Sequence, residues 1–439
     1  MYRFVETKLV EWLNRRDRKP LIVRGARQVG KTWSILQFGK KIFPGKIYYV
    51  DLEKNYNFHK FFEPDLEPKR IISDLEIALN TRIIPGEGLL FLDEIQSCPR
   101  ALMSLRYFYE ELPDLHIIAA GSLLEFALKD ISFPVGRVQF LEMRPMSFLE
   151  FLLALGNEKA VEVILDESIE IPETTHLLLL DLLRRYFFVG GMPECVKTYV
   201  ETQKLSEVFE VQRNLIESFR EDFSKYSIQV DKHCLNAVLV NAARSVGNQI
   251  VFSRLSDGFT SPTNKKAFVV LSNARLLQPI YPVKSPELPL GAFVSNKKVK
   301  SIFVDVGLLQ YVSGVQVNEE YYKEDLLGIY NGRLAEQFVG QELLANGVNE
   351  LYYWAREAKS STAEIDYIFD LERKIIPIEV KSGPAGRLKS LHLFLRKYPR
   401  IENAYVLSSA PFGYLPEQKL NFIPLYAISR FFKKNIKKN

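Results

Sequence analysis

Short apolar runs alternate with amphipathic stretches over the first third of the chain. Four of these runs have the length of a strand, namely KPLIVRG (19–25), KIYYVDLE (46–53), GLLFLDEI (88–95) and LHIIAAGS (115–122), and stretches of helical period separate them. Uninterrupted apolar strands that alternate with helices are typical of a parallel sheet wrapped by helices. We therefore predict an α/β domain over residues 1–150.

The first of these runs leads into a candidate phosphate-binding loop. Residues 25–32, GARQVGKT, match GxxxxGK[ST] at every fixed position, and the helical SILQFGKK follows closely. Glycines let the backbone turn its N–H groups toward phosphates, while Lys31 reaches the β- and γ-phosphates and Thr32 can bind Mg²⁺. We predict an ATP site formed by Gly25, Ala26, Arg27, Gln28, Val29, Gly30, Lys31, Thr32 and Trp33.

Four further residues are candidates for the chemistry of ATP hydrolysis. The run at 88–95 ends in Asp93, which would hold the Mg²⁺ shell, and Glu94, which would orient the attacking water. Ser122 ends the next run, where a polar sensor of the γ-phosphate or a plain strand-end serine would fit. Arg137 is either a surface residue or a charge that stabilises the γ-phosphate of its own or a neighbouring subunit.

The middle of the chain is predicted to be helical at first and then winged-helix-like. Residues 151–230 read as a helical lid over the nucleotide, and 231–318 as three helices followed by the two strands of a wing. Basic residues of this module either contact DNA phosphates, or the module only packs between its neighbours. These residues are Lys265, Lys266 and Arg275 near the third helix, and Asn296, Lys297, Lys298 and Lys300 near the wing tip.

Two apolar runs near the end of the chain, EIDYIFD (364–370) and IIPIEVKSG (375–383), fit adjacent strands that bring Asp366 near Glu379. Glu336 lies on the apolar stripe of a predicted helix, where an acid is costly unless it is paired or metal-bound. With Lys381, the order and spacing match a PD-(D/E)xK nuclease core. Asp366 and Glu379 would bind Mg²⁺ and Lys381 would position the attacking water. The alternative is a half-buried edge strand with solvated charges.

Composition restricts the partners less than the motifs do. The chain has 439 residues and a net charge of +5, but residues 430–439 alone contain five basic residues and no acid. Overall charge therefore gives no argument for nucleic acid. Three separated cysteines, Cys98, Cys195 and Cys234, favour a reduced compartment and disfavour zinc. Because no apolar run is long enough to span a bilayer and the start lacks the apolar core of a signal peptide, we expect a cytoplasmic protein without membrane contact.

Six motifs in this order resemble one protein family. GARQVGKT, LLFLDEI, AAGS, the GR of VGRV, RPMSFLEF and GGMPE (190–194) are similar to those of bacterial AAA-type (AAA_14) ATPases with a C-terminal DUF4143 domain, which are related to the STAND branch. The resemblance covers essentially the whole chain. It implies an ASCE sheet with an extra strand between the phosphate-loop strand and the Asp93 strand. It also implies a restriction-endonuclease-like domain, here at 319–439, with an EVK motif. Trp33 stands where such loops usually have a small or polar residue.

The sequence thus predicts an ATP-hydrolysing switch or motor that acts on nucleic acid and carries a candidate metal-dependent nuclease domain. ATP and Mg²⁺ are the expected cofactors, and DNA and a protein are candidate partners. The sequence carries no signal of an oligomeric state. The alternative is a STAND-like regulatory ATPase, whose nuclease-like domain binds a protein or nucleic acid without cutting it.

Overall fold

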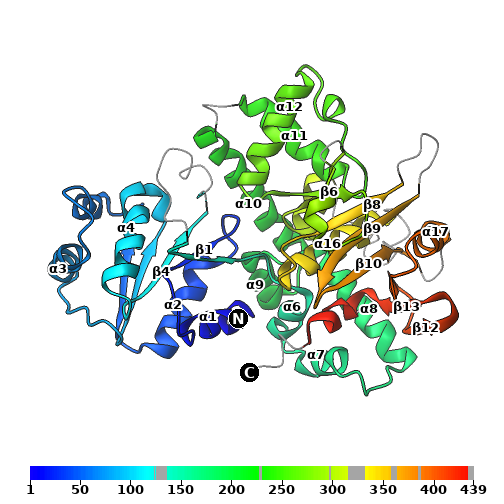
Figure 1. Ribbon diagram of the computed structural model, residues 1–439, viewed down its shortest axis with the longest axis horizontal. Coiled ribbons are helices and arrows are strands. Elements are labelled where there is room, and N and C mark those ends of the chain that lie inside the picture. The colour runs from blue at the N-terminus through cyan, green and yellow to red at the C-terminus, as the bar shows by residue number, and fades with distance from the viewer. Residues whose placement is uncertain are drawn as a thin grey trace. The chain divides into compact units, whose positions relative to one another are not determined.

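The computed structural model describes residues 1–122, 124, 136–226, 230–295, 298–314, 332–356, 363–383 and 387–433, without the side chains of 225 and 226. The chain divides into two compact units at the bond between Arg144 and Pro145. We call Arg3–Arg144 the N-terminal unit and the chain from Pro145 onward the C-terminal unit (Figure 1). The segments predicted as lid, winged-helix-like module and nuclease-like domain all lie in the C-terminal unit, and their bounds stay predictions.

The N-terminal unit contains a parallel five-stranded sheet, as predicted. Strand β4 lies between β1 and β3, which confirms the expected extra strand between the phosphate-loop strand and the Asp93 strand. All residues of β3 and β4 are buried, which explains their uninterrupted apolar sequences. Across the sheet the order is β2 (Ile47–Asp51), β3 (Leu89–Asp93), β4 (His116–Gly121), β1 (Leu21–Arg24) and β5 (Gln139–Glu142).

Helices cover this sheet and close its core. Buried side chains from β3 and β4, such as Leu90 and Ile117, form one apolar cluster with Leu75 and Phe108 from the covering helices. The predicted α/β fold, a parallel sheet wrapped by helices, is thereby confirmed. The helical elements are α1 (Val5–Leu13), α2 (Lys31–Ile42), η1 (Tyr56–Phe62), α3 (Pro68–Leu79), η2 (Ile95–Ser97) and α4 (Pro99–Glu111).

The C-terminal unit begins with a helical region, as the pattern from residue 147 predicted. Ser147 and Glu150 form a reciprocal capping box at its first helix. A break at Gly190–Gly191 follows α8, and Gly191 approaches Met146 so closely that a Cβ would lie 2.0 Å from the Met146 carbonyl oxygen. The helices are α6 (Phe148–Ala154), α7 (Glu158–Leu165), α8 (Glu173–Val189), α9 (Pro193–Thr202) and α10 (Leu205–Tyr226).

The predicted winged-helix-like module has only some of its expected elements. Its first and third helices are α11 (Lys232–Arg244) and α12 (Ser261–Asn273), while the second is reduced to the single turn η4 (Phe252–Arg254). The predicted wing strands, β6 (Leu277–Val283) and β7 (Lys300–Phe303), are antiparallel. However, β6 also pairs in parallel with β8 (Tyr352–Ala355). The two strands therefore extend the C-terminal sheet instead of forming a separate wing.

That mixed sheet has eight strands. Its strands from β8 to β13 lie in the yellow, orange and red part of the ribbon (Figure 1). Strand β10 lies between β9 and β11, so the edge-strand interpretation of IIPIEVKSG is wrong. Strands β9 and β10 form an antiparallel hairpin whose turn residues Glu372 and Arg373 both have positive φ. The order is β12 (Gly413–Leu415), β13 (Leu420–Pro424), β11 (Ala404–Ser408), β10 (Lys374–Val380), β9 (Glu364–Leu371), β8, β6 and β7.

Helix α16 (Arg333–Ala345) packs closely on this sheet. A Cβ at Gly340 would lie 2.3 Å from Ile302 Cδ1 and 2.5 Å from the Tyr367 hydroxyl, so only glycine allows this approach. The Gln337 side chain exchanges two 2.9 Å hydrogen bonds with the backbone of Phe303 on the edge strand β7. These contacts hold Glu336 close to the sheet. The remaining helical elements are η5 (Leu290–Phe293), α13 (Val306–Val312), α17 (Lys389–Lys397), η6 (Pro416–Gln418) and η7 (Leu425–Phe432).

Within the described ranges, no helix is both long and apolar enough to cross a membrane.

Candidate functional site

The phosphate-binding loop connects β1 to α2, as the sequence predicted. Gly30 directly precedes α2 with φ of 90°, and Gln28 also has a positive φ, of 65°. A Cβ at Gly25 would lie 2.1 Å from the carbonyl oxygen of Met143, the residue that follows β5. The first glycine is therefore required because the loop lies against this carbonyl, and the last because α2 starts from a left-handed residue.

Lys31 is the first residue of α2, and its side chain folds back over the loop. Its Nζ donates hydrogen bonds to the carbonyl oxygens of Gly25, at 3.1 Å, and Ala26, at 2.9 Å. Burial lowers the pKa of Lys31 to about 8, although the carboxylates of Glu94 and Asp93 oppose this change. A phosphate would supply the negative charge that this ammonium lacks.

Asp93 joins the phosphate loop to the neighbouring strands. Its Oδ2 accepts a 2.8 Å hydrogen bond from the Thr32 hydroxyl and a 3.2 Å hydrogen bond from the Tyr49 hydroxyl. Burial raises the pKa of Asp93, and the hydrogen bonds from Thr32, the Glu94 N–H and Tyr49 oppose this rise. Sequence reasoning missed Tyr49. Its position on the strand beside β3 was the available signal, because parallel strands present their carboxyl ends at one edge.

Glu94 follows β3 with a left-handed backbone, at φ of 48°. Its Oε2 accepts a hydrogen bond from the Gln96 side chain. Burial raises the pKa of Glu94, while the hydrogen bond from Gln96 and the charge of Lys31 act to lower it. The carboxyl is thus held next to Lys31, where a group that orients water would need to be.

Ser122 and Trp33 lie at the same edge of the sheet as the loop. Ser122 is buried and follows Gly121, which pairs with Arg24 at the end of β1. The role of Ser122 as a sensor of the γ-phosphate stays a prediction. Trp33 is 42% exposed. Its side chain is therefore available for a contact with a base, whereas core packing does not account for it.

Arg137 is not brought to this edge. It precedes Gln139, which pairs with Leu21, the first residue of β1, so it lies at the opposite edge of the parallel sheet. Its Nε donates a 2.9 Å hydrogen bond to Oε1 of Glu110, near the end of α4. This geometry does not fit a γ-phosphate contact within the same chain. A contact with the nucleotide of a neighbouring subunit stays a prediction.

The four residues of the predicted nuclease core come together in the C-terminal unit. Oδ2 of Asp366, on β9, accepts a 2.8 Å hydrogen bond from the backbone N–H of Val380 on β10. The neighbouring Glu379 is 6% exposed, and its Oε1 accepts a 2.5 Å hydrogen bond from Lys381 Nζ. Oε2 of Glu379 is buried and has no hydrogen-bond partner among the described residues. Glu336, on α16, is close enough to affect the charge of Glu379.

Lys300 is also part of this site, which corrects its interpretation as a DNA contact at the wing tip. Its side chain is only 4% exposed because strand β7 directs it beneath α16. Its Nζ lies 2.9 Å from Glu336 Oε1, forms an ion pair with Glu364, and lies 3.9 Å from Asp366 Oδ1. Gln249 donates a 3.1 Å hydrogen bond to the other oxygen of Glu364. Neither Lys300 nor Glu364 was predicted to be part of this site. Their strands, β7 and β9, belong to the same sheet, and only the three-dimensional structure shows that the two side chains meet.

The charges of this site are strongly coupled. Burial raises the pKa of Glu379, and the Asp366 carboxylate raises it further, while Lys381 opposes both. Burial also raises the pKa of Glu336, against the charge of Lys300. For Lys300 itself burial favours the neutral amine, but Glu336 and the acids of β9 outweigh it and raise its pKa. The site therefore holds the charged ammonium of Lys300 among carboxyls that have too few positive neighbours.

Two places could hold a divalent cation with oxygen ligands. In the N-terminal unit the Thr32 hydroxyl and the Asp93 carboxylate are adjacent and fit Mg²⁺ that also binds phosphates. In the C-terminal unit the unpartnered Oε2 of Glu379 beside Asp366 fits a cation as well. Across the described part of the chain, however, no group of three or more His, Cys, Asp or Glu side chains is placed to hold a metal ion. Any cation would therefore need ligands from water or substrate.

Three of the basic residues predicted to contact DNA are exposed. Arg275 is partly buried, and Lys300 belongs to the acidic site. Asn296 and Lys297 lie outside the described residues. The exposed residues are Lys265 and Lys266 on α12, and Lys298 before β7.

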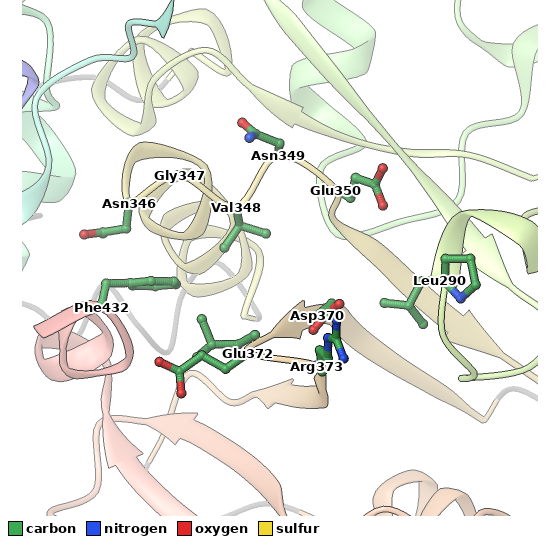
Figure 2. A pocket seen from close by; sticks show the side chains of 12 residues that line it. Leu290, Asn346, Gly347, Val348, Asn349, Glu350, Asp370, Glu372, Arg373 and Phe432 are labelled. Atoms are coloured by element: carbon green, nitrogen blue, oxygen red, sulfur yellow. The ribbon is translucent and has the colours of Figure 1, made fainter. Parts of the chain in front are cut away.

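A pocket of about 400 Å³ lies at the turn of the β9–β10 hairpin (Figure 2). Neither Asp366 nor Val380 lines it. The end of α16, the hairpin turn and Phe432 form its walls. Charged side chains of both signs line it, and it shares no residue with the candidate nuclease site. The lining residues are Pro289, Leu290, Asn346, Gly347, Val348, Asn349, Glu350, Asp370, Leu371, Glu372, Arg373 and Phe432.

Three family models match successive parts of the chain. An AAA domain (AAA_14) matches residues 17–152, a domain of unknown function (DUF8612) matches residues 180–319, and another (DUF4143) matches residues 331–428. The first and third matches confirm the architecture that the motifs indicated, an AAA-type ATPase domain followed by DUF4143. No curated protein matches the chain.

Similar solved structures are distant. The Aeropyrum pernix ORC1 protein in complex with DNA is 15% identical, with a TM-score of 0.29 over 71% of this chain and 92% of that chain. Drosophila ORC bound to DNA is 13% identical, with a TM-score of 0.27 over 71% of this chain and 95% of that chain. AMPPCP-bound DnaA from Aquifex aeolicus is 15% identical, with a TM-score of 0.26 over 58% of this chain and 82% of that chain. TM-scores this low carry no argument about function.

Proposed function

We propose that this chain, with its AAA-type ATPase domain and its DUF4143 domain, hydrolyses ATP and uses the nucleotide to control a C-terminal unit that acts on nucleic acid. The hydrogen bond between Thr32 and Asp93 carries the first part of this proposal. It joins the phosphate loop to the strand end that also bears Glu94. An aspartate and a hydroxyl in this relation are the usual protein ligands of nucleotide-bound Mg²⁺.

The residues of the N-terminal unit have distinct roles in this proposal. Bound Mg²⁺ would neutralise phosphate charge. Lys31 would exchange its bonds to the Gly25 and Ala26 carbonyls for phosphate oxygens, and the loop N–H groups would complete the contacts. Glu94 would hold the attacking water next to the γ-phosphate, and Ser122 would contact that phosphate. Release of the γ-phosphate would remove these contacts and so change the conformation of the loop.

For the C-terminal unit we propose metal-dependent cleavage of nucleic acid. A buried oxygen of Glu379, which lacks a hydrogen-bond partner among the described residues and lies next to Asp366 and Lys381, supports this activity. Asp366 and Glu379 would bind Mg²⁺, which would polarise a phosphodiester oxygen when bound. Lys381 would position the attacking water, and Glu336 would orient the site from α16. Lys265, Lys266 and Lys298 would contact the phosphate backbone.

A second candidate function is a regulatory ATPase whose nuclease-like domain binds a partner without cutting. One observation favours it. Lys300 and Lys381 are both already engaged with the acids of the site, so the network is partly neutralised without any metal ion. Because one fold can host unrelated functions, a nuclease-like domain can serve as a binding module.

Cleavage assays separate the two candidates. Linear and circular duplex DNA, single-stranded DNA and RNA would be incubated with Mg²⁺ or Mn²⁺, with and without ATP. We expect the unmutated chain to cut at least one substrate, and Asp366→Asn and Lys381→Ala to lose cutting while they retain ATP hydrolysis. Lys374→Ala, an exposed lysine on the same strand β10, is the matched control. Absence of cutting on every substrate, with ATP hydrolysis intact, would favour the regulatory ATPase.

A further inference from the structure

Lys300 and the acids that surround it come from different segments of the chain. It lies in the segment that matches DUF8612, whereas Glu336, Glu364 and Asp366 lie in the segment that matches DUF4143. Strand β7 nevertheless places its ammonium among these three carboxylates, at 2.9 Å from Glu336 and 3.9 Å from Asp366. The middle segment of the chain thus supplies one positive charge of the site, and Lys381 of the C-terminal segment supplies another.

The ammonium of Lys300 is held in this position. The side chain is 4% exposed, and the Tyr353 ring lies 5.3 Å from Nζ, where it adds a favourable cation–π contact. The strand itself is fixed because Gln337 bonds both backbone groups of Phe303. Lys300 cannot reach solvent without a movement of β7 or α16, so its charge is a permanent part of the site.

The charges of the site do not balance with lysines alone. Among the residues that the structure describes, the site has four acids, Glu336, Glu364, Asp366 and Glu379, while Lys300 and Lys381 provide two positive charges. Two negative charges remain when all acids are ionised, which is the charge of one divalent cation. Without Lys300 the excess would be three, and the Asp366 carboxylate would be free from its nearest competing cation. Buried carboxylates without counter-charges are strongly unfavourable, so this excess favours the uptake of protons or of metal ions.

We propose that Lys300 is a built-in cation of the C-terminal acidic site, which takes the place of one metal ion and thereby limits the affinity of the site for divalent cations. This inference rests on the proposed cation site at Asp366 and Glu379. Lys300 is a positioning residue here: it orients Glu336 and Asp366 and competes for their charge. It also makes the site dependent on β7, so that a displacement of this strand would increase metal affinity.

The test is calorimetric titration of the full chain with Ca²⁺ in the absence of nucleotide, at one fixed pH. Methionine has nearly the shape of lysine without its charge, so Lys300→Met should bind Ca²⁺ at least about tenfold more tightly than the unmutated chain. Lys300→Arg keeps the charge and should bind Ca²⁺ with unchanged affinity. Equal or weaker binding by Lys300→Met would overturn the proposal.

Two further variants keep the test decisive. If Lys300→Met alone does not fold, Lys300→Gln removes the same charge and can still donate a hydrogen bond to the carboxyls, so it should bind Ca²⁺ more tightly than the unmutated chain, with a thermal midpoint that rises on Ca²⁺ addition. An unchanged affinity in this second variant would also overturn the proposal. Asp366→Asn defines the baseline. If Ca²⁺ binding survives Asp366→Asn, the proposed cation site is itself wrong. If Asp366→Asn abolishes binding and Lys300→Met leaves it unchanged, only the role of Lys300 is wrong.

Discussion

The backbone N–H of Val380 donates a 2.8 Å hydrogen bond to Oδ2 of Asp366. This bond fixes the aspartate of β9 against the end of β10, where Glu379 and Lys381 flank Val380. It also occupies one oxygen of Asp366, so the other oxygen is the one directed at Lys300, 3.9 Å away. The hydrogen bond from Val380 therefore determines which oxygen of Asp366 faces the backbone and which faces Lys300.

Lys31 is expected to be essential for nucleotide binding. Lys31→Ala removes a buried ammonium whose present partners are two carbonyl oxygens and whose proposed partners are phosphates. The loss of hydrogen bonds to a charged ligand should weaken ATP binding by about 10- to 100-fold. Equilibrium binding of a fluorescent ATP analogue measures this change. Lys41→Ala, an exposed lysine at the other end of α2, should bind normally. Normal binding by Lys31→Ala would show that the loop is not the nucleotide site.

Glu94 is expected to determine the pH dependence of ATP turnover. Its pKa is raised above 4.5 by burial, and the hydrogen bond from Gln96 opposes this rise. Only the carboxylate can orient and activate water, so turnover should fall as the pH falls through this raised pKa. Gln96→Ala removes the opposing hydrogen bond and should move the acid limb of the kcat profile to higher pH. Glu94→Gln should lower kcat by about 100-fold or more and leave ATP binding intact. An acid limb that Gln96→Ala does not move would contradict this role.

The basic face of α12 is expected to bind nucleic acid through phosphates. Lys265 and Lys266 are exposed on this helix, and each would release counterions on binding. The double alanine variant should weaken binding similarly for all sequences. It should also reduce the slope of log affinity against log salt concentration by roughly 2. Fluorescence anisotropy with labelled duplex DNA at several salt concentrations measures both quantities. An unchanged slope would mean that α12 only packs within the C-terminal unit.

Glu342 is expected to make the stability of the C-terminal unit depend on pH. Its Oε1 accepts a 2.8 Å hydrogen bond from the Phe148 N–H, its Oε2 has no partner among the described residues, and burial raises its pKa from 4.5 to about 8. The folded state therefore binds this proton more tightly than the unfolded state. The free energy of unfolding should then decrease as the pH rises between these two pKa values.

Glu342→Gln tests this dependence, because glutamine keeps the acceptor for Phe148 and cannot ionise. At a pH of about 9 the variant should be more stable than the unmutated chain by on the order of 2 kcal/mol, and the difference should shrink in mild acid. Denaturant unfolding at both pH values measures it. Glu417→Gln, at an exposed glutamate, is the control and should change nothing. A Glu342→Gln variant that is less stable at every pH would show that the carboxylate is needed in its ionised form.

The sequence determined the ATPase fold and its loop because their signals are local. Fully buried parallel strands require uninterrupted apolar residues, and a loop that surrounds phosphates requires glycines at fixed places, so both are visible in short stretches such as 19–32 and 88–95. The pairing of Asp366 with the end of β10 was also predictable, because a short connection leaves adjacent antiparallel strands as the simplest arrangement.

The tertiary structure alone decided the positions of Arg137 and Lys300. Arg137 lies at the opposite sheet edge because the direction of β5 is set by its parallel pairing with β1. Lys300 changed from a predicted surface charge to a buried one because β6 joins the C-terminal sheet through β8, which places β7 beneath α16. The sequence of a strand does not reveal which distant segments will lie beside it. In an alternating pattern, a lysine that faces water and a lysine that faces three carboxylates occupy the same kind of position.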